Sequence, residues 1–482
     1  MRIGIDARMY STDFTGIGRY TAELTRNLAK LDTKNEYVLF MNRPEYDSFD
    51  PPNKRFSKVL VKARHYSFRE QTVYLWQLYR AKLDLMHFTH FNAPIFYCKK
   101  SIVTIHDLTL SFFPGKKMNS WFYRMAYNLV LKAAVRHAER IIAVSENTKN
   151  DLVDITHVNP GRVEVIYEGV GEEFGPRLDG PQIDETLKKY GIAKDFLLYT
   201  GVWRGHKNLV NLVKAFALLR EGPEGFDLSL VITGEEDPYY PEVKRTVSEL
   251  GLEHHVIYAG MVPPSDLTAL YQAARVYTFP SLYEGFGLPP LEAMRCGTPV
   301  AASKTSCIPE VCGENNAVYF DPYDPEDIAN SVRKLLLDEG LRESLREAGL
   351  RHSLKFSWEA MAEKTLEVYG YALEKRRSSH ARNQSQKLGT TLYSSKTGCP
   401  RRLPITKWSV KLVRRLFAGV SVRWPPRLLA TGALRSLAPN FSSAECFMCL
   451  SQTVCGRRKF TCTATNFGGA GTALWTRRIL QT

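Results

Sequence analysis

Short apolar segments alternate with amphipathic segments through residues 2–375 of the chain. The apolar segments are rich in β-branched and aromatic residues, which favours buried strands. Between them, apolar residues recur every three or four positions, which predicts helices. This alternation is typical of doubly wound parallel sheets, so we predict an α/β fold. Strands are expected at residues 2–6, 36–41, 58–63, 83–90, 102–105, 141–144, 196–200, 228–234, 255–260, 275–279 and 299–303, and helices at 18–31, 71–83, 121–139, 208–219, 265–274, 289–296 and 356–375.

A cluster of glycines and prolines, Gly175, Pro176, Gly180 and Pro181, divides this pattern into two Rossmann-like halves. Ligands of such sheets bind at the carboxyl ends of the strands. The predicted domains are residues 1–172 and 173–356, an amphipathic helix at 357–375 and a tail at 376–482. Trp358, Met361, Leu366 and Tyr369 mark the apolar face of that helix, and Ser265 is a candidate N-cap for the helix at 265–274.

The net charge of +15 comes entirely from the tail. Residues 376–482 hold 19 Lys and Arg and one acid, Glu445, which leaves 46 basic and 49 acidic residues elsewhere. The body therefore lacks the basic excess that would indicate a nucleic-acid partner. With 44% hydrophobic residues, the chain is long enough for two or three domains.

Cysteine usage and the N-terminus predict a cytoplasmic protein. Four cysteines of the body (Cys98, Cys296, Cys307 and Cys312) have no paired spacing, which suits a reducing compartment. A strand begins at residue 2, which leaves no room for a signal peptide, and no run of about 18 apolar residues would span a membrane.

The tail shows no alternation of strand and helix patterns. We expect it to be disordered or to come from a reading-frame slip in the gene. Its cysteines Cys446, Cys449, Cys455 and Cys462 do not match a common zinc-finger spacing. Residues 407–424 are basic and amphipathic and could lie on an anionic membrane, so peripheral contact with the inner face of the plasma membrane is an option.

The segment 281–300, SLYEGFGLPPLEAMRCGTPV, carries the strongest chemical signal. Gly285 and Gly287 let the backbone approach a ligand, and Pro289 and Pro290 suit the first turn of a helix. A strand, a Gly-rich loop and a helix N-terminus favour an anion such as a diphosphate. The carboxylates Glu284 and Glu292 would repel phosphate but accept hydrogen bonds from hydroxyls, unless both are merely solvated surface charges.

Other polar residues follow predicted strands. Arg204 and Lys207 stand between a strand and a helix, where cations neutralise a leaving diphosphate unless they are plain loop charges. Gly16 and Gly18 form an incomplete dinucleotide fingerprint. No Asp-x-Asp triplet or paired His ligands appear in the body, so no metal is expected. Further candidates at strand ends are His106, Asp107, Ser145, Glu146, Asn147, Gly234 and Glu235.

Two Glu separated by seven residues, with GFG and PLEA between them, resemble the donor-site motif of glycosyltransferase family 4, the retaining transferases of GT-B fold. The resemblance covers residues 1–372. The chain is most similar to bacterial mannosyltransferases of O-antigen and related polysaccharides in five sequence segments: GIDAR, TGIGRY, TIHDL, HKNL and EGFGLPPLEAM. This resemblance implies GDP-mannose as donor, a glycan or lipid-linked acceptor, no cofactor and no metal, and a final helix that crosses back to the first domain.

The resemblance also implies roles for single residues in a cleft between the domains. Glu284 would hold the sugar hydroxyls and Glu292 the ribose. His106 would lie near the anomeric carbon, and Asp107 would orient its ring. The position of Arg204 departs from the family pattern, because many members carry the arginine where this chain has Val202. The leaving phosphate would contact Lys207, Arg204 and the amides of Phe286, Gly287 and Leu288, and Gly16, Gly18 and Arg19 would face that phosphate from the first domain. Gly234 and Glu235 would lie near the base or ribose. Ser145 and Asn147 would lie on the acceptor side.

Two alternatives stay open. Another GT-B enzyme, such as a sucrose- or trehalose-type synthase, would use a UDP-sugar, because no residue identified here reads the base. A catalytically silent scaffold could use the tail to hold a membrane or nucleic acid, although the intact Glu pair and Lys207 argue against it.

Overall fold

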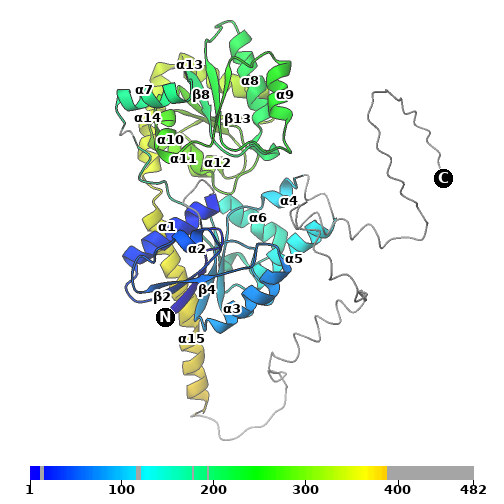
Figure 1. Cartoon of the computed structure of the whole chain (residues 1–482), viewed down its shortest axis with the longest axis vertical. Coiled ribbons are helices and arrows are strands. Elements are labelled where there is room, and N and C mark those ends of the chain that lie inside the picture. Colours follow the sequence, from blue (N-terminus) through cyan, green and yellow to red (C-terminus); the bar gives the residue numbers. More distant parts are fainter. Residues whose placement is uncertain (11–15, 116–120, 176–177, 193–194, 388–482) are drawn as a thin grey trace, which may run out of the picture. The chain divides into compact units, whose positions relative to one another are not determined.

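The computed structural model describes residues 1–10, 16–115, 121–175, 178–192 and 195–387, with side chains up to residue 373. The predictions for residues 407–424 and for the four tail cysteines lie outside the described residues. In the described part, two parallel α/β sheets confirm the predicted fold class (Figure 1). We call the first sheet with α1–α6 the first lobe, and the second sheet with α7–α14 the second lobe.

The first sheet has the strand order β3-β2-β1-β4-β5-β6-β7. Its strands are β1 (Arg2–Asp6), β2 (Glu36–Met41), β3 (Phe56–Leu60), β4 (Leu85–Phe88), β5 (Ser101–Ile105), β6 (Arg140–Ala143) and β7 (Val163–Val165). Its helices are α1 (Gly16–Leu31), α2 (Glu45–Ser48), the π-helix η1 (Glu70–Tyr74), α3 (Leu75–Arg80), α4 (Thr109–Phe112), α5 (Trp121–His137), α6 (Glu146–Thr156) and the 3₁₀-helix η3 (Pro160–Arg162).

The second sheet has the strand order β10-β9-β8-β11-β12-β13. Its strands are β8 (Phe196–Tyr199), β9 (Ser229–Thr233), β10 (Val256–Gly260), β11 (Val276–Phe279), β12 (Val300–Ser303) and β13 (Val318–Phe320). Its helices are α7 (Gly180–Lys189), the 3₁₀-helix η4 (Gly205–Lys207), α8 (Leu209–Glu221), α9 (Glu242–Glu249), α10 (Pro264–Ala273), α11 (Leu288–Arg295), α12 (Ile308–Cys312), α13 (Pro325–Leu337) and α14 (Glu339–Ser353).

Helices cover both faces of each sheet. On the first sheet, α1 packs on one face through Leu24 and Leu28, and α3 and α5 pack on the other through Leu78 and Leu131. The central strands β1, β4 and β5 are buried almost throughout, which explains their continuous apolar sequences. Both sheets therefore direct the loops after their strands to one edge, where the candidate site residues lie.

The last helix, α15 (Trp358–Lys387), follows the second lobe in sequence but packs on the first. Met361 and Tyr369 are buried there as predicted, beside α1. The Tyr369 hydroxyl lies 2.7 Å from Nδ1 of the fully buried His87, and burial lowers the pKa of His87 to about 3. The helix thus closes the core of the first sheet.

Two local predictions were wrong. Ser265 does not cap α10, because Pro263 takes the N-cap position and Pro264 the first helical position, without a side-chain cap bond. The helix expected at 71–83 is divided, because the π-helix η1 precedes α3. The predicted domain boundaries stay predictions.

Candidate active site

The segment between β11 and α11 forms the loop that carries Glu284. Gly287 has φ +91°, a conformation that favours glycine, and α11 begins directly after it. Pro289 and Pro290 lack amide protons, so the helix N-terminus offers few donors of its own. Instead, the amides of Phe286, Gly287 and Leu288 donate no hydrogen bond within the described residues. Three adjacent amides are therefore free to meet an anion.

The two predicted charges nearest this loop form an ion pair. Nζ of Lys207, in η4, lies 2.6 Å from Oε1 of Glu284, although 77 residues separate them. Their side chains are only 19% and 12% exposed. Arg204 is exposed, and no ion pair joins it to another described residue. Among the described residues, Lys207 is therefore paired with the loop that carries the free amides, whereas Arg204 makes no ion pair.

Ser306 fixes the backbone of Glu284 in both directions. Its hydroxyl donates to the Glu284 carbonyl at 2.7 Å and accepts from the Glu284 amide at 3.2 Å. The buried Cys307 thiol donates to the carbonyl of Phe286 at 3.1 Å. The segment 306–311 lies within the predicted second domain, 173–356, and nothing in its sequence marked it as support for the loop.

The second carboxylate, Glu292, is buried and engaged by both lobes. Arg19 of α1 donates from Nη1 to its Oε1 at 2.7 Å, and the Tyr271 hydroxyl donates to its Oε2 at 3.1 Å. Arg19 also pairs with Glu173. Burial raises the pKa of Glu292, whereas Arg19 and the Tyr271 bond lower it. Arg19, predicted to face the donor phosphates, instead holds the carboxylate predicted to bind ribose.

His106 follows β5 as expected, but Asp107 does not orient it. The His106 ring donates from Nε2 to the Thr89 carbonyl at 3.0 Å, and its Nδ1 lies 2.8 Å from Oε1 of the buried Glu168. Asp107 accepts from the amide of Thr109 at 2.8 Å and so stabilises the turn into α4. The prediction for Asp107 was wrong because this local bond was overlooked. Glu168, just beyond β7, could have been found by applying the strand-end rule to that strand.

The loop between β11 and α11, residues 280–287, which we call the donor loop after its predicted role, contacts the first lobe at Gly285. Its carbonyl accepts from the hydroxyls of Ser145 at 2.6 Å and Thr148 at 3.0 Å. A Cβ on Gly285 would lie 1.7 Å from the His106 carbonyl oxygen, which only glycine avoids. Ser145, the N-cap of α6, was predicted on the acceptor side and here contacts the donor loop.

The start of α6 makes a second contact with the other lobe. Both oxygens of Glu310 accept backbone amides, those of Glu146 at 2.7 Å and Asn147 at 3.0 Å. A carboxylate is favourable at a helix N-terminus. The Asn147 side chain donates to Asp151 at 2.9 Å, so its predicted acceptor-side role is not evident from its contacts and stays a prediction.

The remaining candidates are backbone positions. Gly16 is the exposed first residue of α1, and a Cβ there would meet no described atom. Gly18 is buried in the same helix turn. Gly234, at φ +99°, lies so close to Gly201 that a Cβ would be 2.1 Å from its carbonyl oxygen, and Glu235 is exposed. Tight backbone packing accounts for Gly234; a contact with the base or ribose stays a prediction.

Comparisons with known proteins match this arrangement. Residues 14–174 match the family model "Glycosyltransferase Family 4", and residues 182–352 match "Glycosyl transferases group 1". The O-antigen chain mannosyltransferase B of Escherichia coli is 30% identical over 374 residues, which are 74% of this chain and 96% of that protein. The chain belongs to glycosyltransferase family 4.

Solved structures agree with the GT-B fold of this family. Sucrose-phosphate synthase from Thermosynechococcus elongatus aligns with a TM-score of 0.62 at 22% identity, covering 77% of this chain and 98% of that structure. Alr3699/HepE of Anabaena, in complex with UDP and glucose, aligns with a TM-score of 0.61 at 17% identity, covering 77% and 100%. The two family models and the 30% identical relative, not these folds, show that the chain is a hexosyltransferase related to mannosyltransferases of O-antigen synthesis.

The described ranges of this family 4 chain hold neither a metal-ligand cluster nor a membrane-spanning helix. Within the described ranges, no three His, Cys, Asp or Glu side chains come together as metal ligands would. None of the helices in those ranges combines the length and apolar character needed to cross a bilayer. The metal-independent mechanism stays a prediction.

Proposed function

We propose that the enzyme transfers mannose from GDP-mannose, with retention and without a metal, to a glycan or lipid-linked acceptor of a cell-surface polysaccharide. The observation that supports this most directly is the Lys207–Glu284 pair beside the three free amides of Phe286, Gly287 and Leu288. It brings the Lys207 cation of η4 against the loop that carries both the amide donors and the hydroxyl acceptor Glu284, as a nucleotide sugar requires. The name of the 30% identical relative supports mannose.

In the proposed reaction, Glu284 accepts hydrogen bonds from the sugar hydroxyls and Glu292 from the ribose. Lys207, Arg204 and the free amides stabilise charge on the departing diphosphate. The bond between the anomeric carbon and phosphate oxygen breaks while the acceptor oxygen attacks from the same face, and the acceptor proton passes to the phosphate oxygen. His106, held by Glu168, supports the anomeric centre as a fixed wall rather than through a free nitrogen.

A donor panel tests this function. Thermal shifts of the full chain are measured with GDP-mannose, UDP-glucose and ADP-glucose, followed by product analysis with the donors that bind. We expect GDP-mannose to raise Tm most, because a ligand stabilises the state it binds. A larger shift and turnover with UDP-glucose would overturn the choice of donor in favour of the UDP-sugar alternative.

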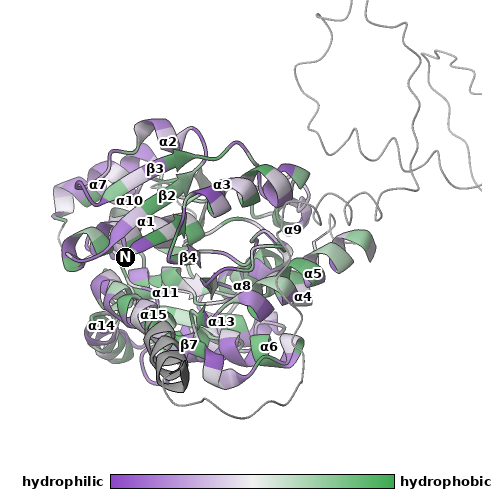
Figure 2. Cartoon of the chain, turned by 90° about the horizontal axis from the view of Figure 1, so that it is seen from below, coloured by the Kyte–Doolittle hydropathy of each residue, from purple (hydrophilic) through white to green (hydrophobic). Residues whose placement is uncertain are grey.

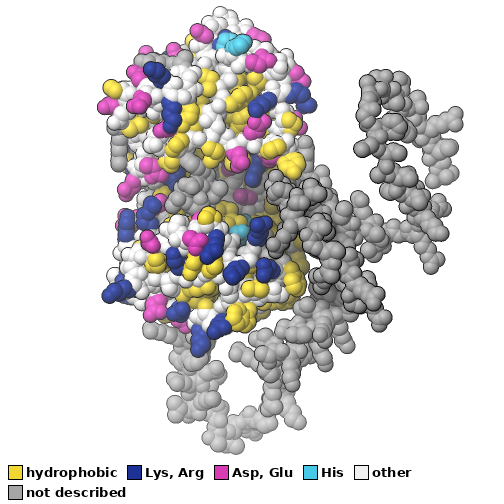
Figure 3. Space-filling model, viewed as in Figure 1, with side chains coloured by type: hydrophobic (Ala, Val, Ile, Leu, Met, Phe, Trp, Pro, Cys, Tyr) yellow, Lys and Arg dark blue, Asp and Glu magenta, His cyan; other side chains and the backbone are white. Residues whose placement is uncertain are grey.

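We also propose that the enzyme works at the inner face of the plasma membrane and contacts it through α5. This helix has two apolar stripes. Tyr127, Leu131 and Val135 are buried in the first lobe, whereas Phe122, Met125 and Leu129, at a spacing of three and four, are exposed. Figure 2 shows hydrophobic colouring along α5, and Figure 3 shows hydrophobic side chains on the side where Figure 1 places it. One stripe suffices for folding, so the second is left for a partner.

The charge of the sequence segment that contains α5 favours an anionic bilayer as that partner. Residues 62–136 contain 12 Lys and Arg but 3 Asp and Glu, and of these Glu70 is fully buried. Exposed Lys132 and Arg136 continue the apolar stripe along the helix. Cations beside exposed aromatic and aliphatic side chains suit an anionic lipid surface.

Sedimentation with phosphatidylglycerol or phosphatidylcholine vesicles tests this contact. We expect the full chain to bind the anionic vesicles, and a Phe122→Ser, Leu129→Ser variant to bind at least about tenfold more weakly. Tyr323→Ser removes an equally exposed apolar side chain from the second lobe and should change nothing. Unchanged binding of the α5 variant would refute this surface.

A further inference from the structure

The first lobe contains a buried network of charged side chains, Arg8, Asp6 and Glu70, that has no role in the proposed reaction. Arg8 follows β1, and its side chain is 1% exposed. It pairs with Asp6 through two bonds of 2.8 and 2.7 Å and with Glu70 at 2.6 Å. Burying charges costs free energy that such pairs regain only in part, so stability alone is a poor reason for the network.

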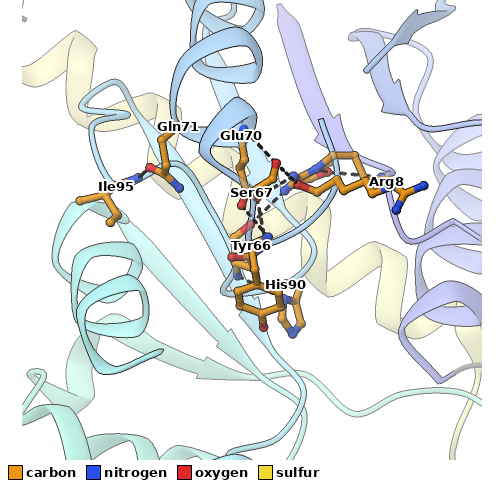
Figure 4. A network of polar contacts seen from close by, with 10 residues as sticks. Arg8, Tyr66, Ser67, Glu70, Gln71, His90 and Ile95 are labelled. Carbon is orange, nitrogen blue, oxygen red and sulfur yellow. Dashed lines mark hydrogen bonds and ion pairs between the residues drawn. The ribbon is translucent and has the colours of Figure 1, made fainter. Parts of the chain in front are cut away.

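Glu70 connects this network to two surface loops (Figure 4). Its Oε2 accepts from the amide of Tyr66 at 3.0 Å, and its Oε1 accepts from Nδ2 of Asn92 at 2.9 Å. Arg8 donates to the carbonyl of Asn92 at 2.9 Å. One fully buried carboxylate thereby fixes both the loop of Tyr66 and the loop of His90 and Asn92.

The Tyr66 ring and the His90 ring both point away from the Glu70 carboxylate that fixes their loops (Figure 4). Tyr66 is 58% exposed and has φ +58°, which is unusual for a residue with a large side chain. The Asn92 amide donates to Nδ1 of His90 at 3.1 Å, so that nitrogen carries no proton and Nε2 carries one. No described residue accepts from Nε2. The pair therefore offers an apolar ring and an unused N–H donor.

These side chains stand next to the proposed reacting position. His90 follows β4 and His106 follows the neighbouring β5, and the His106 ring binds the carbonyl of Thr89, the residue before His90. The backbone of His106 in turn contacts Gly285 of the donor loop. Burial and the nearby His106, His65 and Arg8 hold the pKa of His90 well below its usual value, so its ring stays neutral.

We propose that Tyr66 and His90 form the acceptor subsite, that this subsite takes an uncharged pyranose, and that Glu70 is a positioning residue for both side chains. The Tyr66 ring packs on the apolar face of the sugar, and Nε2 of His90 donates to one of its hydroxyls. Neither of these two side chains itself carries a charge that would pair with a phosphorylated acceptor. The inference rests on the proposed function and names the acceptor class of that site.

The test separates transfer from donor hydrolysis in the full chain. Hydrolysis of GDP-mannose is measured without acceptor, and transfer is measured with methyl α-mannopyranoside as the uncharged probe and mannose 6-phosphate as the anionic one. His90→Phe keeps the ring that packs on Phe91 and removes the N–H, and Tyr66→Ala removes the ring face. We expect each to lower kcat/KM for methyl α-mannopyranoside by about 10- to 100-fold.

Donor KM and hydrolysis should stay within about twofold in both variants. Trp76→Ala removes an aromatic ring of the same 58% exposure from α3 and should leave transfer unchanged. Glu70→Gln should raise KM for the acceptor more than it lowers kcat, which a merely structural role would not do. Transfer unchanged in His90→Phe, hydrolysis and transfer falling together, or a preference for mannose 6-phosphate would each overturn the subsite. A wild-type enzyme that neither hydrolyses nor transfers would instead refute the proposed function on which the subsite rests.

Discussion

Nη1 of Arg19 lies 2.7 Å from Oε1 of Glu292, so an arginine of the first lobe holds a carboxylate of the second. Because Glu292 is buried, its pKa is raised, and the positive charge of Arg19 lowers it. When ionised, the carboxylate can accept the proposed ribose hydroxyls at both oxygens, whereas protonation turns one oxygen into a donor. Arg19 therefore keeps Glu292 charged while competing for one of its oxygens.

Replacing Arg19 by Gln should make donor binding depend on pH. The pKa of Glu292 then rises further, so the donor KM should increase on acidification at a higher pH than in the wild type. At pH 8 we expect Glu292 to be ionised in both the wild type and the variant. The variant's carboxylate is no longer paired with Arg19, so its donor KM should be lower than that of the wild type. Initial rates from pH 5.5 to 8 measure this, with Arg26→Gln, on the same helix but paired with Glu23, as control. A donor KM raised by the same factor at every pH would show that Arg19 binds the donor itself.

Breaking the Lys207–Glu284 pair should abolish most turnover. Lys207→Met removes the fixed charge that stabilises the leaving diphosphate, and we expect kcat to fall by about 10²- to 10³-fold. Glu284→Gln keeps the shape of the side chain and should mainly affect kcat through the sugar hydroxyls. Lys214→Gln, which removes an exposed lysine from α8, is the control. Wild-type kcat in Lys207→Met would contradict the site.

Substituting Gly285 by Ala should displace the donor loop. The added methyl group would lie 1.7 Å from the His106 carbonyl oxygen, so the loop or the strand end must move. We expect a lower Tm and a loss of kcat of at least about tenfold, since positioning errors near 1 Å cost up to about 10²-fold. Gly370→Ala is the matched control, because a Cβ there meets no atom and alanine favours the helix. Full activity of Gly285→Ala would contradict the contact.

The hydroxyl of Tyr369 should contribute measurably to stability. Tyr369→Phe leaves Nδ1 of the fully buried His87 without this partner, which we expect to cost about 1–3 kcal/mol of unfolding free energy. Tyr371→Phe changes an exposed tyrosine of the same helix and should be neutral. Urea unfolding of the full chain compares the two, and equal midpoints would show that α15 does not depend on this bond.

Acidification from pH 6.5 to 5.5 should destabilise the enzyme. The pKa of His87 is about 3 in the folded state, so in this range the unfolded chain takes up a proton that the folded chain does not. The free energy of unfolding should fall by up to about 1.4 kcal/mol per pH unit for this residue. Burial lowers the pKa of His65 and His206 to about 4, which acts in the same direction.

Urea midpoints at the two pH values measure this effect. His65→Asn, at a half-buried position, should reduce the dependence on pH, and His254→Asn, at an exposed one, should not. The raised pKa values of Glu70 and Glu292 act in the opposite direction, because these carboxyls gain protons more readily when folded. A midpoint that rises on acidification would show that the carboxyls dominate.

The sequence predicted those parts of the fold and site that depend on local patterns. Strands such as β5 and β11 are continuous apolar runs, and Glu284 and Glu292 have a recognisable spacing around a Gly-rich loop. Glu168, Ser306 and Glu70 were missed, because each is a single polar residue whose role comes from a partner brought near by folding. Asp107 was misjudged since its nearest donor is its own chain two residues on.

The bonds from Ser145 and Thr148 to Gly285 have a consequence for cooperativity. They join the loop proposed to bind the nucleotide diphosphate to α6 of the first lobe, the lobe that carries the proposed acceptor subsite. If donor binding changes the free energy of acceptor binding through these bonds, acceptor binding must change the free energy of donor binding by the same amount, because linkage between two ligands is reciprocal. Each substrate should therefore change the affinity for the other by the same factor.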